Sequence, residues 1–250
     1  MLSKAKGTRR AYWFILPAAL CMLFVHFVPI IWGAYISLLD LDVYTLTQWT
    51  SAPFVKLGNY IKLFSGKFAV GQRFLRSVYN VFVYGLVTIP TGYIIGLLVA
   101  LLLNRNFVGR TFVRGIILLP YITPDSVAYN VWRFIFQARI GLVNKYLLKF
   151  GLIQEPLVWL VGKRALTAVI IASIWKGWPF ACLILLAGLQ GIPAELYEAA
   201  KIDGASVWQQ FKMITLPMLA PVTKTLLLLN VIWNFHAYNQ FYILLGGSVG

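Results

Sequence analysis

Five long apolar stretches constrain this chain more than any other feature of its sequence. They cover residues 11–39, 74–103, 115–136, 165–188 and 217–245. Each is long enough to cross a bilayer as a helix, which needs about 20 apolar residues. With 60% hydrophobic and only 12% charged residues, the chain has too few charges to cover a soluble domain, in which about a quarter of residues are charged. We therefore expect an all-α membrane protein, with a basic tail at 1–10 and one transmembrane helical bundle at 11–250.

The basic residues predict how these spans are oriented. The tail and the connection at 104–114 together contain seven Lys and Arg and no acid, as expected of cytoplasmic segments. The N-terminus is then cytoplasmic, and so is the segment 189–216. The longer outer segments also contain Lys and Arg, so charge alone leaves the opposite orientation open. The first stretch is too long for a signal-peptide core and has no small-residue cleavage site.

The net charge of +15 raises the question of nucleic-acid binding. The basic residues are scattered between apolar runs, without an aromatic–basic stripe or a known binding motif. Anchoring of loops at the membrane surface accounts for the excess. We therefore expect membrane lipid, and no nucleic acid, as a partner.

Two prolines and two charges fall in the middle of the predicted bundle. Pro120 and Pro124 each remove a backbone donor from the third stretch, so this helix should kink and face protein or water. Asp125 follows in the same stretch, and Lys176 lies near the middle of the fourth. A central charge costs about 2.5–3.5 kcal/mol on insertion scales, so neither should face lipid. We hypothesise that Asp125 and Lys176 pair beside the pathway; the alternative is that water or backbone satisfies each separately.

The fifth stretch is rich in side-chain amides. It carries Asn230, Asn234, His236, Asn239 and Gln240. Asn230 and Asn234 can share one helical face, and amides with aromatic rings suit the hydroxyls and flat faces of a sugar. Asn230, Asn234 and Asn239 are therefore candidates for the substrate pathway, although hydrogen bonding between helices explains them equally well. His236 has no partners at metal-ligand spacing, and no residues converge as a catalytic set, so we expect neither a metal site nor a catalytic site.

Smaller features predict local packing. Gly92 and Gly96 stand four residues apart in the second stretch and allow a neighbouring backbone to approach closely. A short surface helix is expected at 59–64, between the first two spans.

The segment 189–216 is too polar to span the membrane, yet its pattern is regular. Pro193 suits the first turn of a helix, and Gly204 can take the left-handed conformation that ends one. Ser206 and Gln209 then have capping-box spacing for a second helix. The local chemistry predicts a helix, a sharp turn and a helix, which on this pattern alone is also typical of an ordinary amphipathic connector.

The same segment carries a longer pattern of fixed residues. It consists of Glu198, Ala199, Ala200, Asp203, Gly204, Ile214, Leu216 and Pro217. This pattern resembles the EAA signature of permease subunits in binding-protein-dependent ATP-binding-cassette (ABC) importers. Stretches elsewhere, including Leu118-Leu119-Pro120, Trp132-Arg133 and Ile174-Trp175-Lys176, are similar to the carbohydrate-uptake branch. The whole set resembles the first permease of importers of the maltose or glycerol-3-phosphate type.

The resemblance implies a mechanism and a set of partners. The EAA loop would dock into a cytoplasmic ATPase dimer, a second permease would complete the pathway, and an extracytoplasmic solute-binding protein would deliver the cargo. ATP and Mg would be used by the ATPase, with no cofactor bound by this chain, which has no GxxxxGK[ST] phosphate-binding loop. The implied location is the inner membrane of a prokaryotic cell, crossed several times.

The sequence departs from the family at its end. Family members have a sixth core helix after a Gly-rich loop resembling Gly246-Gly247, where this sequence stops. We expect a truncated sequence, with completion of the bundle by a partner as the alternative.

Two other functions remain: an ion-coupled secondary transporter, and an intramembrane enzyme using Asp125, Lys176 or His236. Neither explains the pattern from Glu198 to Pro217.

Overall fold

The computed structural model describes residues 2–247, and the side chains of residues 12–247. Throughout this described part the chain is built from helices and loops, with a single isolated β-bridge between Leu39 and Phe54. The expected all-α class is confirmed. The chain divides into two compact units, Met1–Val78 and Tyr79–Gly250, whose boundary falls inside one long helix.

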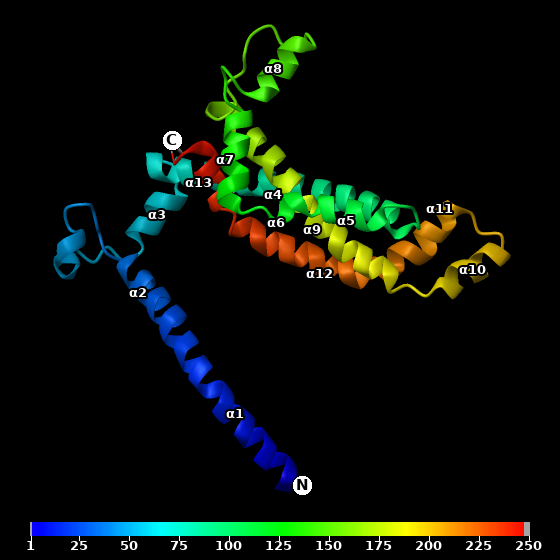
Figure 1. Cartoon of the computed structure of the whole chain (residues 1–250). Coiled ribbons are helices and arrows are strands. Elements are labelled where there is room, and N and C mark those ends of the chain that lie inside the picture. Colours follow the sequence, from blue (N-terminus) through cyan, green and yellow to red (C-terminus); the bar gives the residue numbers. More distant parts are fainter. Residues whose placement is uncertain (1, 248–250) are drawn as a thin grey trace. The chain divides into compact units, whose positions relative to one another are not determined.

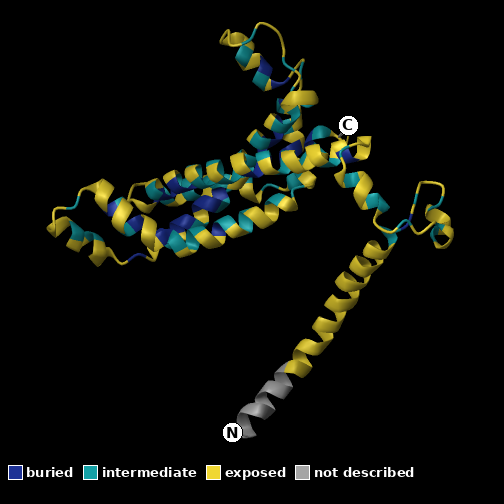
Figure 2. Cartoon of the chain, turned by 180° about the vertical axis from the view of Figure 1, so that it is seen from behind, coloured by how far each residue is buried: buried dark blue, intermediate teal, exposed yellow. Residues whose placement is uncertain are grey.

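The first unit begins with a long helix, and none of its described side chains, from Tyr12 to Ile36, is buried. It comprises α1 (Leu2–Met22), a π-helical turn (Leu23–Phe27) and α2 (Val28–Ile36). The apolar part, Tyr12–Ile36, contains no buried residue in the isolated chain, and Figure 2 shows it as exposed along nearly its whole length. An apolar helix without covering protein is suited to lipid or to another membrane helix. The backbone of residues 2–10 continues α1, while the side chains of the predicted basic tail lie outside the described residues.

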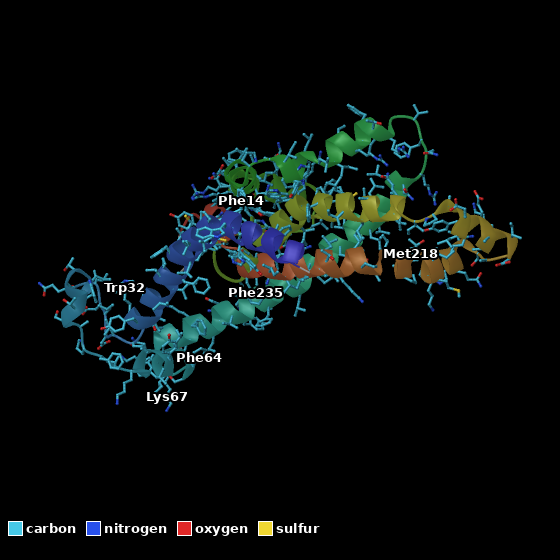
Figure 3. The ribbon with its side chains drawn as sticks, turned by 90° about the horizontal axis from the view of Figure 1, so that it is seen from below. Phe14, Trp32, Phe64, Lys67, Met218 and Phe235 are labelled. Atoms are coloured by element: carbon cyan, nitrogen blue, oxygen red, sulfur yellow. The ribbon has the colours of Figure 1, made fainter. Side chains whose placement is uncertain are left out.

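The rest of this unit is an ordered loop. A 3₁₀ turn (Leu46–Ser51) precedes α3 (Gly58–Phe64), which confirms the short helix expected at 59–64. The Asn59 amide donates to the carbonyls of Ser37 and Leu39 at 3.0 and 2.8 Å. Phe64, labelled in Figure 3, meets the edge of Phe74. Local hydrogen bonds therefore fix the chain between its first two long helices.

The acidic turn before this loop is also held by local bonds. The carboxylate of Asp42 accepts hydrogen bonds from the backbone N–H and hydroxyl of Thr45 and from the N–H of Tyr44. These bonds hold the pKa of Asp42 below its usual value because they favour the charged form. The backbone N–H of Thr45 has the largest effect, followed by the Thr45 hydroxyl.

The second unit packs three long helices together. They are the greater part of α4 (Ala69–Asn104), α9 (Ala165–Gln190) and α12 (Leu216–Phe235). Its shorter helices are α5 (Arg110–Ile117), α6 (Leu119–Ile122), α7 (Asp125–Ile135), α8 (Leu142–Lys149), α10 (Ala194–Ile202), α11 (Val207–Gln210) and α13 (Asn239–Leu245). Figure 1 shows α9 and α12 side by side, with α10 and α11 at one end of this bundle and α8 at the other.

Helix α9 provides the centre of the core. Ala168, Ala172 and Leu185 on it are completely buried. One cluster joins α9 to α4 and α12, and another joins it to α7 and α13. Small residues let the helices approach: a Cβ on Gly96 of α4 would lie 2.8 Å from the Cβ of Ala181, whereas one on Gly92 would meet no atom within 4 Å. Of the predicted glycine pair, only Gly96 is therefore a packing contact.

The third predicted span, 115–136, is not one kinked helix. The chain forms α5, α6 and α7, with breaks at Leu118 and at Thr123-Pro124. Thr123 is extended, with ψ 128°, because the ring of Pro124 disfavours helical backbone in the residue before it. The prolines predicted to bend this stretch instead end one helix and start another.

The fifth predicted span, 217–245, is also divided. Helical backbone begins at Val207, continues through a π-helical turn (Phe211–Thr215) into α12 and ends at Phe235; α13 then follows. Met218 and Phe235 mark the two ends of α12 in Figure 3. At the break the Nδ1 atom of His236 bonds the carbonyl of Ile232 at 2.9 Å, and such local bonds compete with a continuing helix.

Four helical segments in the described chain are long and apolar enough to cross a membrane. They are Tyr12–Ile36, Ala69–Asn104, Gly162–Gln190 and Val207–Phe235. They coincide with the first, second, fourth and fifth predicted stretches, with boundaries shifted by a few residues or more. The third stretch differs because its break leaves no helix of sufficient length.

The polar segment 137–164 is organised around one buried amide. The side chain of Asn144 is almost fully buried. It donates to the carbonyls of Ala138 and Leu157 and accepts from Trp159 Nε1 at 2.9 Å. The N–H of Leu157 also donates to Asn144 Oδ1 at 3.3 Å. These four hydrogen bonds connect the ends of this segment to α8.

Candidate functional site

A cavity of about 360 Å³ opens in the second unit where its broken helices meet. Its walls come from α4, α6, α7, α9, α12 and α13. All five residues predicted for the substrate pathway line it, namely Asp125, Lys176, Asn230, Asn234 and Asn239. His236 and Gln240 line it as well. The structure therefore gathers polar residues from three predicted spans at a single place.

Asp125 and Lys176 form an ion pair in this cavity. The distance between Lys176 Nζ and Asp125 Oδ1 is 3.1 Å, which bears out the pairing hypothesis. Lys176 also donates to the carbonyl of Thr123 at 2.6 Å and, at 3.4 Å, to that of Tyr121. These carbonyls are free to accept because α6 ends at Ile122, just before Pro124. The alternative, that each charge is satisfied separately, is wrong, although the ammonium group uses the carboxylate and the backbone of the broken helix together.

The asparagines of the cavity are held in different ways. The Asn230 amide donates to the carbonyl of Leu226 on its own helix at 2.8 Å, so its carbonyl oxygen is left to face a solute. Asn234 donates to the carbonyl of Val81 on α4 at 3.2 Å and packs directly over Gly85, where a Cβ would come within 2.8 Å. Asn234 therefore joins helices, as the alternative reading proposed, while also lining the cavity.

Aromatic rings complete the cavity wall. Tyr121 stacks on Phe180 with ring centroids 5.2 Å apart, and Phe180 meets Trp233 at 5.3 Å. The Gln240 amide donates a hydrogen bond to the Tyr84 hydroxyl oxygen at 3.1 Å. Flat rings beside amide groups suit a solute with apolar ring faces and hydroxyl edges. Sequence patterns did not single out these aromatics, because nothing in their spacing separates them from core residues.

The loop at 189–216, called the coupling loop below, has the predicted helix–turn–helix form. Helix α10 ends at Ile202, and Gly204 follows with φ +78°. The N–H of Ala205 bonds the carbonyl of Ala200 at 2.8 Å, and that of Gly204 bonds Lys201 at 3.1 Å. This pair of bonds is a Schellman motif, which closes a helix through a left-handed residue.

The second helix of the coupling loop starts with the expected capping box. The Ser206 N–H donates to Gln209 Oε1 at 2.7 Å, and the Gln209 N–H donates to Ser206 Oγ at 3.3 Å. Helix α11 then continues through the π-helical turn into α12. The loop is thereby joined without interruption to the helix that carries Asn230 and Asn234.

The tip of the coupling loop exposes a concentration of large apolar side chains. Ile202, Val207 and Trp208 are 87%, 78% and 69% exposed. Glu198 and Ala199 are exposed on α10, the helix that ends at Ile202, and Ala200 is half-buried. An apolar patch with small and acidic residues beside it is typical of a surface that another protein covers.

One contact behind the loop was not predicted from the sequence. The hydroxyls of Tyr197 on α10 and Thr215 at the start of α12 lie 2.9 Å apart, and Thr215 is buried. The bond holds the first helix of the loop against the base of α12. The two residues are eighteen positions apart, and a contact between separate helices is not indicated by a local sequence pattern.

Among the described residues, no group of three or more His, Cys, Asp or Glu is placed to hold a metal ion. The charged groups of the cavity are engaged with one another and with backbone carbonyls. The arrangement is thus suited to binding a polar solute by hydrogen bonds and ring contacts.

Comparison with known proteins gives a consistent set of matches. Residues 92–250 match the family model described as "Binding-protein-dependent transport system inner membrane component". The chain is 36% identical to the trehalose/maltose transport system permease protein MalF of Thermococcus litoralis, over 99% of this chain and 80% of that protein. It is 30% identical to the trehalose transport system permease protein SugA of Mycobacterium tuberculosis, over 98% and 76% of the two chains.

A solved structure has the same fold. It is a chain of a bacterial ABC transporter involved in the import of the acidic polysaccharide alginate, with a TM-score of 0.78 and 23% identity. The match covers 98% of this chain and 79% of that one.

Proposed function

We infer that this chain, which belongs to the family of binding-protein-dependent transport system inner membrane components, forms half of the translocation pathway of an ATP-driven sugar importer. The observation that carries this proposal is the placement of the cavity and the coupling loop on one continuous helical path. The residues predicted for solute binding and those predicted for energy coupling are joined through α12.

The cargo is a sugar, an oligosaccharide or a related polyol. Relatives over nearly the whole chain are named for trehalose or maltose transport, and the amides and aromatic rings of the cavity suit hydroxylated rings. Asn230 presents a free acceptor, Trp233 presents a ring face, and Asn239 begins α13 at the cavity wall. These groups would bind the solute during its passage, together with side chains from a second permease.

The coupling loop would transmit force from a cytoplasmic ATPase dimer. Its exposed tip, with Glu198, Ala199 and Gly204 beside Ile202 and Trp208, is the proposed docking surface. Closure of the ATPase dimer would push this surface, and the rigid Schellman turn and the Tyr197–Thr215 bond would pass the movement to α12. Asp203, Ile214, Leu216 and Pro217 would maintain the path from the turn to that helix.

The remaining parts of the assembly follow from this role. An extracytoplasmic solute-binding protein would deliver the sugar, and ATP and Mg would be used by the ATPase, with no cofactor held by this chain. The chain acts as a transport permease, and hydrolysis is assigned to its partner. The location is the inner membrane of a prokaryotic cell, crossed several times, with the N-terminus and the coupling loop in the cytoplasm.

Replacing Asn230 with leucine tests the pathway. The variant keeps the side-chain volume but removes the acceptor, and we expect kcat/KM for uptake of labelled trehalose or maltose to fall about tenfold, the effect of one lost hydrogen bond of about 1–1.5 kcal/mol. Val231→Leu is the matched control, because Val231 lies beside Asn230 on α12 outside the cavity lining. Equal uptake by Asn230→Leu and the control, for every sugar tested, would remove this residue from the pathway.

A further inference from the structure

The cavity contains a charge pair whose two members are unequally exposed. The side chain of Asp125 is 46% exposed, whereas that of Lys176 is 14% exposed. The carboxylate is therefore the more accessible member of the pair. We expect a solute in the cavity to contact it more readily than the ammonium group.

This pair determines the charge of the whole cavity. Among its lining residues, all within the described chain, Asp125 and Lys176 are the only Asp, Glu, Lys or Arg. The wall also contains the imidazole of His236. The Nδ1 atom of this ring is hydrogen-bonded to the carbonyl of Ile232. With one positive and one negative charge 3.1 Å apart, the wall is close to neutral.

The position of Lys176 does not depend on Asp125 alone. Its ammonium group also donates to the carbonyls of Thr123 and Tyr121 at the end of α6. These backbone acceptors would keep it beside the cavity if the carboxylate were neutral. Removing the charge of Asp125 would then leave an uncompensated positive charge facing the solute.

We propose that Asp125 is a specificity-determining residue that screens Lys176 and so makes this side of the pathway select neutral sugars over sugars that bear a carboxylate. The inference rests on the proposed function and adds the charge class of its substrate. A carboxylated sugar would be repelled by Asp125 and denied the ammonium group behind it, since opposite and like charges at a few ångströms both act strongly in a partly desolvated site. Neutral hydroxyls can instead donate to the exposed carboxylate.

The test measures binding to the complete importer in lipid nanodiscs, without the binding protein, whose own selectivity would otherwise intervene. Trehalose and its mono-uronate are titrated while tryptophan fluorescence is followed, because Trp178 and Trp233 line the cavity. Four forms are compared: the unaltered chain, Asp125→Asn, Lys176→Met and the double variant. Side chains of the second permease are the same in all four, so their contribution cancels.

We expect the unaltered chain to bind trehalose at least tenfold more tightly than the uronate. Asp125→Asn should raise the affinity for the uronate at least tenfold relative to the affinity for trehalose, which loses a charged acceptor for its hydroxyls. Lys176→Met should bind the uronate more weakly than the unaltered chain does. The affinity of the double variant for the uronate should be within threefold of that of the unaltered chain. The gain in Asp125→Asn should shrink at high salt, because screening acts on the new attraction.

Three results would overturn the proposal, and they are distinguishable. If trehalose binds normally but the uronate preference is the same in all four forms, or if both sugars weaken equally in Asp125→Asn, then Asp125 does not select charge while the sugar pathway stands. If trehalose binds to none of the forms, the proposed function fails together with the inference.

Discussion

Replacing Gly204 with valine is expected to reduce ATP-driven uptake at least 100-fold while leaving the chain in the membrane. Gly204 has φ +78°, a conformation that costs an L-residue roughly 1–2 kcal/mol and is worse for a β-branched one. Refolding of the turn would break the two bonds of the Schellman motif and misdirect α11 relative to α10. The docking surface for the ATPase, which both helices form, would then be lost.

The measurement for Gly204→Val is co-purification of the ATPase with the tagged permease, together with uptake. Gly109→Val is the matched control, because Gly109 has φ +84° in a different turn and its Cβ would also meet open space. We expect the control to retain the ATPase, since it places a similar strain outside the coupling loop. Retention of both the ATPase and full uptake by Gly204→Val would contradict the assigned role of this loop.

Replacing Gly96 with leucine is expected to prevent stable folding of the second unit. Even the Cβ of alanine would lie 2.8 Å from both the Ala181 Cβ and the Cys182 backbone nitrogen. Backbone cannot yield as a flexible side chain does, so α4 and α9 would have to separate. We expect Gly96→Ala to lose about 1–3 kcal/mol of stability, as overpacked sites do, and Gly96→Leu to lose more.

Thermal unfolding in detergent, followed by tryptophan fluorescence, checks the Gly96 prediction. Gly92→Ala, one helical turn away, is the matched control because its Cβ would have no neighbour within 4 Å. Its stability should be unchanged or raised by up to about 1 kcal/mol, since alanine favours helix over glycine. A melting temperature for Gly96→Ala equal to that of Gly92→Ala would show that α4 and α9 do not approach closely at this point.

Much of the fold follows from local sequence, and the coupling loop illustrates why. Pro193, Gly204, Ser206 and Gln209 specify a helix start, a left-handed stop and a capping box through bonds that span only a few residues. Such features depend little on distant packing, so the pattern predicted them correctly. Four of the five predicted spans correspond to helices of sufficient length and hydropathy, because these two properties are what identifies a membrane span.

The divided helices were harder to predict, because tertiary contacts decide between a kink and a break. Pro124 alone permits either outcome. The break after α6 is stabilised by Lys176, which lies far along the chain and donates hydrogen bonds to the freed carbonyls of Thr123 and Tyr121. The sequence contained both the proline and the lysine, but only the fold brings them together.

The candidate site was predicted in part for a similar reason. Charges and amides inside apolar stretches stand out, and Asp125, Lys176 and Asn230 were found in this way. The aromatic wall of Tyr121, Phe180 and Trp233 was not, since aromatics in apolar stretches are ordinary core residues by pattern. The Tyr197–Thr215 bond was missed because it is a contact between separate helices.

The central claim is that this chain conducts sugar by a movement driven from an ATPase docked on its coupling loop. Uptake of labelled trehalose or maltose into proteoliposomes holding the complete importer tests it most directly, with ATP or an ion gradient as alternative energy sources. We predict that uptake requires ATP and the binding protein, and that Glu198→Ala in the coupling loop abolishes it. Uptake driven by an ion gradient without ATP, and unaffected by that substitution, would contradict the claim.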